Sequence, residues 1–364
     1  MYTFYSDEYQ RSIYMIQLKK KFYKISSMLI LFVSMISCDD SIQKEISFYH
    51  WKTNFALNEE ERSILKNVNA SKLYIKFFDV SWVAEDNRAY PKATIQFTET
   101  DMTGIQDIVP VIFITNNVFE KVNTPEDIKH LSSNVSEKIK RIYATHLNGQ
   151  FSIKEIQFDC DWTVGTKEAY FDFINQIKAS KAFMELKNPL ITATIRLHQI
   201  KYKNKTGVPP VDRGVIMFYN TGTVFKLEEQ NSILSVAEVE KYIDTLGEYP
   251  LVYDVAFPTF SWAVVFRNNS FLGLINDVTE KDLMQNFTSK NGFYEPNQAT
   301  FLKTTFLSEG DKIRLEQPSE KDLEMLAKKV RDASSQETYK VIYYHINSEL
   351  VTLLGSDSLN KIAK

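Results

Sequence analysis

Residues 155–161, Glu-Ile-Gln-Phe-Asp-Cys-Asp, alternate polar and apolar side chains along their whole length. A period of two residues is that of a β-strand, in which successive side chains point to opposite faces. One face is therefore apolar, and the other carries polar side chains, among them the amide of Gln157 and the carboxylates of Asp159 and Asp161. Charged side chains inside a fold must pair or face water. This strand therefore predicts a sheet that encloses a polar or hydrated interior.

Short apolar strands alternate with helical patterns over the rest of the chain. The predicted strands are Leu73–Asp79, Val109–Thr115, Glu155–Asp161, Leu190–His198, Gly214–Tyr219, Leu251–Ala256, Lys312–Glu316 and Tyr339–His345. Strands that alternate with helices form βαβ units and a parallel sheet. Eight such units fit a (β/α)8 barrel, the TIM-type α/β fold. The alternative is an open doubly wound sheet, which usually carries a glycine-rich turn after its first strand, whereas Val80-Ser81-Trp82 stands there.

The helices carry recognisable start signals, and one connection is unusually long. Thr124-Pro125-Glu126-Asp127 supplies an N-cap, a first-turn proline and acidic residues, and Ser235 and Ser319 open two further helices. After the sixth predicted strand, Ser261–Phe266 and Ser270–Ile275 predict a β-hairpin within an insertion. The expected organisation is a leader over 1–37, a tether and lead-in over 38–70, a barrel over 71–348 with an insertion over 257–310, and a C-terminal tail over 349–364.

The composition excludes several classes of protein. The chain has 364 residues, with 43 Lys and Arg against 46 Asp and Glu, so no basic field indicates nucleic acid as a partner. Two cysteines exclude a disulfide framework and a cysteine-rich zinc module. We expect no cofactor and no metal, because no His-x-x-x-His or Cys-x-x-Cys spacing is present. Asp159, Asp161 and His198 would be the ligands if a metal were bound.

The first forty residues have the pattern of a secretory leader. The lysines at 19–21 and 24 precede the apolar run Met28–Ile36, which is far shorter than the roughly 20 residues of a membrane-spanning helix. The run ends in Met35-Ile36-Ser37-Cys38, which resembles a bacterial lipobox and implies that Cys38 is lipid-modified. We expect translation from Met15 and a lipid anchor in the bacterial cell envelope, at the outer membrane. The alternatives are a cleaved secretory signal with an incidental cysteine and a short membrane anchor.

Polar side chains on the inward face of the predicted strands form a candidate acid–base cluster. Asp159 and Asp161 end the third predicted strand, and Arg196 and His198 end the fourth. Two neighbouring carboxylates hold each other's pKa values apart, which suits general acid–base catalysis. Lys76 on the first strand belongs to the same set. The alternative is a structural ion-pair network, in which Asp159 pairs with Arg196 or Lys76.

Aromatic rings and further carboxylates are predicted at the same end of the barrel. Trp82 follows the first strand, Trp162 follows the third, and Trp262 lies in the insertion. Flat rings at a barrel mouth can stack on the apolar faces of sugars. The alternative is that Trp162 and Trp262 only seal the barrel end. Asp254 and Glu316 are the other carboxylates near predicted strand ends and are candidate substrate-binding residues.

Two motifs resemble those of glycoside hydrolase family 18, the chitinase-like (β/α)8 barrels. That family carries D-x-x-D-x-D-x-E on one strand and M-x-Y-D/N two strands later, and residues 156–163 and Met217-Phe218-Tyr219-Asn220 match them in part. The resemblance implies a glycan ligand, with Asp161 orienting the acetamido group of the substrate and Tyr219 supporting the intermediate. Isoleucine replaces the first aspartate, and Thr163 replaces the glutamate that protonates the glycosidic oxygen. The motif also lies on the third predicted strand, whereas the family has it on the fourth.

Further strings are similar to a branch of bacterial lipoproteins with glycoside-hydrolase-like barrels. They are Thr194–Gln199 and Tyr253–Ala256. The resemblance implies a fold and a compartment but no particular reaction.

Two functions are compatible with these residues. The first is a hydrolase that cleaves glycosidic bonds with inward carboxylates at the barrel mouth. The second is a catalytically inactive glycan-binding or scaffold lipoprotein that keeps the cleft without the acid. The missing glutamate favours the second, whereas the clustered Arg196 and His198 favour the first. In either case the ligand is a glycan or another small polar molecule, and Asn220 is expected to contact it.

The lipobox resemblance predicts that Cys38→Ser abolishes lipid attachment, because serine lacks the thiol that accepts the lipid. The variant should incorporate no labelled palmitate, measured by gel fluorography of cells grown with the label. Cys160→Ser is the matched control, because this second cysteine lies in a predicted barrel strand. Equal labelling of the Cys38→Ser chain and the parent chain would contradict a lipid anchor at this residue.

Overall fold

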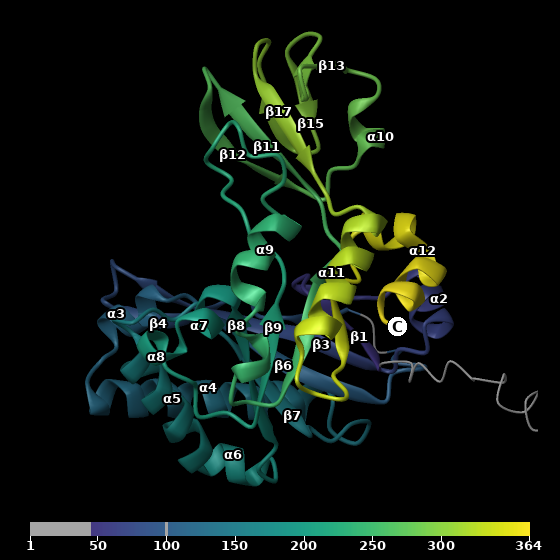
Figure 1. Ribbon diagram of the computed structural model, residues 1–364. Helices are drawn as coiled ribbons and strands as arrows, with labels where there is room; N and C mark the ends of the chain where they lie inside the picture. Colours follow the sequence, from purple (N-terminus) through teal and green to yellow (C-terminus); the bar gives the residue numbers. More distant parts are fainter. Residues whose placement is uncertain (1–44, 99–100) are drawn as a thin grey trace, which may run out of the picture. The chain divides into compact units, whose positions relative to one another are not determined.

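Eight parallel strands form a closed barrel in the computed structural model, which describes residues 45–98 and 101–364 (Figure 1). The strands are β1 Ile46–His50, β3 Lys72–Val83, β6 Asp107–Ile114, β7 Glu155–Asp159, β8 Leu190–Arg196, β9 Arg213–Met217, β10 Tyr253–Pro258 and β18 Val341–Tyr344. Strand β1 pairs in parallel with both β18 and β3, which closes the sheet. The predicted TIM-type barrel is therefore confirmed. Cys38 and the leader lie outside the described residues, so lipidation stays a prediction.

Two predicted strand assignments are wrong. One barrel strand was missed and one strand of the insertion was assigned to the barrel, so the predicted total of eight is unchanged. The barrel begins at Ile46–His50, inside the predicted lead-in 38–70. All five residues of this strand are buried, so it lacks the alternation that marks the strand at 155–161. Lys312–Glu316 is a strand, but it pairs within the insertion as β17. With β1 counted, β7 is the fourth barrel strand and β9 the sixth, so the D-x-D motif lies where the family resemblance requires it.

The helices begin where their capping residues predict. The hydroxyl of Thr124 accepts a hydrogen bond from the backbone N–H of Asp127 at the start of α4, Pro125–His146. Ser235 and Ser319 cap α9 and α11 in the same way. The other helices and their bounds, with those two, are α2 Glu59–Asn67, α3 Asn117–Lys121, α5 Lys167–Ala179, α6 Lys181–Glu185, α7 Leu197–Lys201, α8 Lys203–Thr206, α9 Val236–Ile243, the 3-10 helix η1 Leu246–Glu248, α10 Glu280–Leu283, α11 Glu320–Ala333 and α12 Glu349–Ile362.

Two of these helices lie where the sequence predicts a tail or a strand end. Helix α12 occupies the predicted tail 349–364. Helix α7 starts at Leu197, so His198 lies on a helix and not at the end of a strand. Among the described residues, no helix is long and apolar enough to cross a membrane.

The insertion follows β10 and forms a second sheet with its own core. Five antiparallel strands are ordered β12-β11-β17-β14-β13. The strands outside the barrel are β2 Asn54–Phe55, β4 Arg88–Lys92, β5 Gln96–Phe97, β11 Trp262–Arg267, β12 Ser270–Asn276, β13 Phe287–Lys290, β14 Phe293–Pro296, β15 Thr300–Leu302, β16 Thr305–Leu307 and β17 Lys312–Glu316. The predicted hairpin is confirmed, because β11 pairs with β12 across Asn268 and Asn269, whose φ angles are 51° and 61°. Ala263, Val265 and Ile313 belong to a buried cluster of the insertion.

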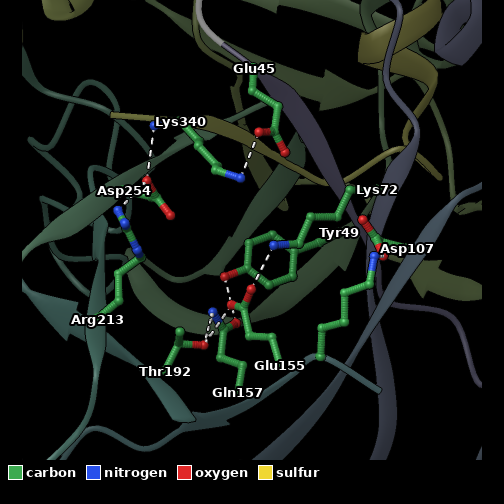
Figure 2. Close-up of polar contacts among 11 residues, drawn as sticks. Glu45, Tyr49, Lys72, Asp107, Glu155, Gln157, Thr192, Arg213, Asp254 and Lys340 are labelled. Atoms are coloured by element: carbon green, nitrogen blue, oxygen red, sulfur yellow. Dashed lines mark hydrogen bonds and ion pairs between the residues drawn. The ribbon is translucent and has the colours of Figure 1, made fainter. Parts of the chain in front are cut away.

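Ion pairs close the N-terminal end of the barrel (Figure 2). Lys72 at the start of β3 lies 2.6 Å from the carboxylate of Glu155 at the start of β7. The hydroxyl of Thr192 on β8 donates to the same carboxylate over 2.9 Å. These groups pair with one another inside the sheet, which offsets the cost of removing them from water.

Asp254 belongs to this end of the barrel and not to the mouth. It is the second residue of β10, and its carboxylate accepts hydrogen bonds from Arg213 and from the backbone N–H of Lys340 (Figure 2). The predicted strand Leu251–Ala256 starts two residues too early and therefore shifts Asp254 towards the wrong end. Its expected role in substrate binding does not agree with this position.

Lys72→Met removes the cation that neutralises Glu155. The two side chains are only 13% and 10% exposed, so the variant leaves a carboxylate without its partner and should lose about 3–5 kcal/mol of the free energy of unfolding. The double variant Lys72→Met/Glu155→Gln leaves neither charge and should recover most of this loss. Urea denaturation followed by tryptophan fluorescence measures both. A single variant as stable as the parent would contradict a buried pair.

Candidate active site

A cavity of about 540 Å³ lies at the C-terminal mouth of the barrel. Residues that belong to or follow each of the eight barrel strands line it, together with residues of the insertion. They are Trp51, Lys52, Lys76, Asp79, Phe113, Asp159, Asp161, Arg196, Met217, Tyr219, Asn220, Phe260, Ser261, Trp262, Asn276, Asp277, Tyr344, His345 and Asn347. In a (β/α)8 barrel this end is the one where ligands bind. Seven of the residues that the sequence predicts for the site therefore meet here: Lys76, Asp159, Asp161, Arg196, Tyr219, Asn220 and Trp262.

Asp161 and Arg196 form a bidentate ion pair in this cavity. Arg196 Nε and Nη2 each lie 2.7 Å from one oxygen of the Asp161 carboxylate. Paired N–H donors in this fork geometry bind a carboxylate more strongly than a single donor does. Arg196 Nη1 also donates to the backbone carbonyl of Tyr219 over 3.4 Å. The side chain of Asp161 is 47% exposed, so the clasped carboxylate still faces the cavity.

Asp159 lies deeper and has no cation against it. Its carboxylate accepts a hydrogen bond of 2.6 Å from the hydroxyl of Thr194. Burial, and next the nearby charge of Asp161, raise the pKa of Asp159 to about 6. The ion-pair alternative is thus only partly right. Arg196 pairs with Asp161, and Lys76 lies 3.2 Å from Asp79 and over the ring of Trp51.

Aromatic rings surround these charges. The ring of Tyr219 stacks on that of Tyr344 with centroids 5.0 Å apart, and the ring of Phe260 packs edge-on against both. Burial raises the pKa of Tyr219 well above its usual value, so its hydroxyl stays protonated. Asn220 follows in the left-handed region, with a φ of 53°. Trp262 lies on the insertion side of the cavity and is partly exposed.

Glu316 supports Trp262 from behind rather than facing a ligand. Its carboxylate is 1% exposed and accepts a hydrogen bond of 2.7 Å from the indole N–H of Trp262. It also accepts from Arg314 over 2.6 Å and from the hydroxyl of Ser232. The expected contact of Glu316 with substrate is therefore replaced by a positioning role.

Three other predicted residues lie away from the cavity lining. Trp162 is fully buried, and its indole N–H donates to the backbone carbonyl of Thr206 over 2.9 Å, so it packs as the alternative predicts. Trp82 lines a second cavity, beside β4 and α4. His198 on α7 is outside the lining, and burial, with the charge of Arg196, lowers its pKa.

Position 163 carries no acid. The hydroxyl of Thr163 lies 3.2 Å from that of Thr166, which in turn donates to the side chain of Asn116. Thr163 lies in the turn before α5, Lys167–Ala179, where its carbonyl accepts hydrogen bonds from the backbone N–H groups of Thr166 and Lys167, and it does not line the cavity. A hydroxyl of this kind does not protonate a glycosidic oxygen as a carboxylic acid does.

The sequence reasoning missed several residues of the cavity wall. Trp51 and Lys52 follow β1, and they were hidden because that strand was not recognised. Asp79 is the last residue of the first predicted strand, Leu73–Asp79, but it was not named as a site residue, and it lies within β3. Ser261 and His345 follow β10 and β18, and their proximity depends on the pairing of these two strands. Among the described residues, no group of three or more His, Cys, Asp and Glu side chains could hold a metal ion.

The fold is that of the chitinase-like (β/α)8 barrels. The spore cortex-lytic enzyme SleL of Bacillus megaterium QM B1551 matches with a TM-score of 0.54 at 12% identity, over 87% of this chain and 74% of that one. SleL of Bacillus cereus matches with a TM-score of 0.52 at 14% identity, over 88% and 74%. The family GH18 chitinase of Cycas revoluta, solved as a complex with allosamidin, gives 0.52 at 12%, over 88% and 98%. Identities this low establish the shared fold alone. No protein-family model matches the sequence, and no curated protein matches it either.

Asp159→Asn tests the raised pKa. Because the folded-state pKa of about 6 is above the usual value of 3.8, the native state binds the proton more tightly, and the stability from this group falls as the pH rises through 6. The amide variant has no such titration. Its free energy of unfolding, relative to that of the parent, should therefore rise by on the order of 2 kcal/mol between pH 4 and pH 7. Denaturation midpoints measured across this range check it. Parallel pH profiles for the two proteins would contradict the burial of this carboxylate.

Proposed function

We propose that this chain is an envelope lipoprotein that binds a glycan in the barrel mouth without hydrolysing it. The observation that carries the proposal is the pair of changes at the family motif. Thr163 stands where the resemblance requires the general acid, and Asp161 is clasped by Arg196 on both oxygens. The barrel fold shared with chitinases and SleL supports a glycan as the ligand.

The bidentate ion pair with Arg196 opposes the role that the family resemblance implies for Asp161. A guanidinium that donates to both carboxylate oxygens occupies one acceptor position on each of them. An acetamido group of a sugar would have to compete with Arg196 for them. Arg196 thereby turns a catalytic carboxylate into one half of a polar surface that can bind sugar hydroxyls.

The walls of the cavity have the features of a sugar-binding cleft. Trp262 and Trp51 are partly exposed, so each offers ring surface on which a sugar can stack. Glu316 fixes the indole of Trp262 through a hydrogen bond, which reduces the entropy lost on binding. Asn220, Asn276 and Asn347 supply neutral donors and acceptors for hydroxyls.

A glycoside hydrolase is the second candidate, and the pKa of Asp159 favours it. A carboxyl group with a pKa of about 6 retains a protonated fraction near neutral pH, which suits a general acid. Against this candidate, Asp159 lies behind Asp161 and is engaged by Thr194. The published structure of the Cycas revoluta chitinase with (GlcNAc)4 makes a GlcNAc oligosaccharide the natural probe for both candidates.

The decisive test uses the full-length chain in mild detergent with chitohexaose and peptidoglycan fragments. We expect saturable binding by isothermal titration calorimetry and no shorter products by mass spectrometry. Trp262→Ala should weaken binding about tenfold or more, because a central aromatic platform is lost. Trp82→Ala is the matched control, since Trp82 lies outside the cavity.

Products that accumulate with the parent chain and vanish with Asp159→Asn would make the protein a hydrolase. Failure of every glycan to bind would contradict both candidates.

A further inference from the structure

One wall of the cavity carries buried polar atoms that have no hydrogen-bond partner. Within residues 45–98 and 101–364, the hydroxyl of Ser261, a residue only 1% exposed, makes no hydrogen bond, and neither does Nδ1 of His345. Both residues line the cavity. Buried polar atoms in native proteins almost always have a partner, and one that lacks it requires an explanation. A polar group on a bound ligand would supply the missing partner here.

The topology brings a third group to the same wall. Strand β18 pairs with β10 on one side and with β1 on the other. Ser261 follows β10, His345 follows β18 and Lys52 follows β1, so all three come from the ends of adjacent strands. Burial, and next the charge of Lys52, lower the pKa of the His345 imidazole to about 4. The His345 ring is therefore neutral at pH 7 and offers one N–H donor.

Among the described residues, Lys52 is the cation in this cavity lining that has no carboxylate partner. Lys76 is paired with Asp79, and Arg196 is paired with Asp161. For Lys52 no carboxylate within residues 45–98 and 101–364 lies within 4.0 Å of the ammonium group. Its side chain is exposed at the cavity rim. The unneutralised charge on this wall is therefore positive.

Asp277, the acidic residue of the insertion in the cavity lining, forms no ion pair with Lys52 within the described residues. Asp277 is tied to this wall through the hydrogen bond from its backbone N–H to the Ser261 carbonyl. Its carboxylate accepts a hydrogen bond of 3.0 Å from the backbone N–H of Glu349 and one of 3.4 Å from the hydroxyl of Ser348. These groups form the N-terminus of α12, where the helix dipole favours a negative charge. Asp277 is thus engaged by the helix.

We propose that Lys52, Ser261 and His345 form a subsite for a carboxylate on the bound glycan, so that the cavity selects acidic sugars over neutral ones. The inference rests on the proposed glycan binding and adds the chemical class of the ligand. Lys52 supplies the charge, while the Ser261 hydroxyl and the His345 imidazole supply hydrogen-bond donors. A carboxylate accepts up to four such bonds, whereas a neutral hydroxymethyl group leaves the cation without a partner.

The test compares matched ligands on the full-length chain in mild detergent. Hyaluronan, alginate and polygalacturonate hexamers are each titrated beside the same oligosaccharide with its carboxyl groups reduced to alcohols. We expect at least one acidic hexamer to bind about tenfold more tightly than its reduced counterpart, the loss expected for one charge-assisted hydrogen bond. Lys52→Gln should abolish this preference, and raising the NaCl concentration should diminish it. Lys328→Gln, at an exposed position of α11 outside the cavity lining, is the control.

Ser261→Ala separates binding from folding. Removing a buried hydroxyl without a partner should leave the thermal midpoint unchanged or raise it. The same change should weaken binding of the acidic hexamer. Equal affinities for acidic and reduced hexamers, unchanged in Lys52→Gln, would overturn the acidic subsite and leave glycan binding standing. Absence of binding to all hexamers and to chitohexaose would contradict the proposed function and this inference together.

Discussion

Strand β1 closes the barrel by pairing with β18 on one side and β3 on the other, and the cavity depends on this pairing. Without it the sheet would have two edges with unpaired N–H and C=O groups. Closure also sets Lys52, at the end of β1, between His345 after β18 and Lys76 on β3. The positive wall of the cavity therefore follows from the same hydrogen bonds that complete the fold.

Across the cavity, the Asp161–Arg196 pair determines which chemistry the family motif can support. The two aspartates keep the spacing of chitinase-like barrels, but the guanidinium binds the outer one and burial keeps the inner one partly protonated. No carboxylate stands at position 163. The cavity thus has a polar surface, while the acid of the chitinase-like motif is absent from position 163. Glu316 likewise does not contact the cavity, because its carboxylate accepts a hydrogen bond from the indole of Trp262 and holds that ring in place.

The fold could be predicted from the sequence because local signals were strong. Alternation at residues 155–161 marks a barrel strand, and the caps at Thr124, Ser235 and Ser319 mark helix starts. Strand β1 was not predicted, because all five of its residues, Ile-Ser-Phe-Tyr-His, are buried and do not alternate between polar and apolar side chains. Strand β17 alternates like a barrel strand, and only its antiparallel pairing with β11 shows that it belongs to the insertion.

Only part of the cavity lining could be predicted from the sequence. Asp159, Asp161, Arg196 and Tyr219 meet because neighbouring parallel strands end at one mouth, a rule that applies without knowing the structure. Trp162 is buried, and its indole N–H donates a hydrogen bond to the backbone carbonyl of Thr206. Because Thr206 is distant in the sequence, this partner could not be predicted from the local sequence.

The central claim is that the mouth holds an intact glycan, and saturation-transfer difference NMR on the full-length chain with chitohexaose or an acidic hexamer tests it most directly. One sample reports both binding and cleavage. The account predicts transfer to the sugar protons and an unchanged set of anomeric signals over days. New reducing-end anomeric signals that grow with time, or no transfer to any sugar proton, would contradict it.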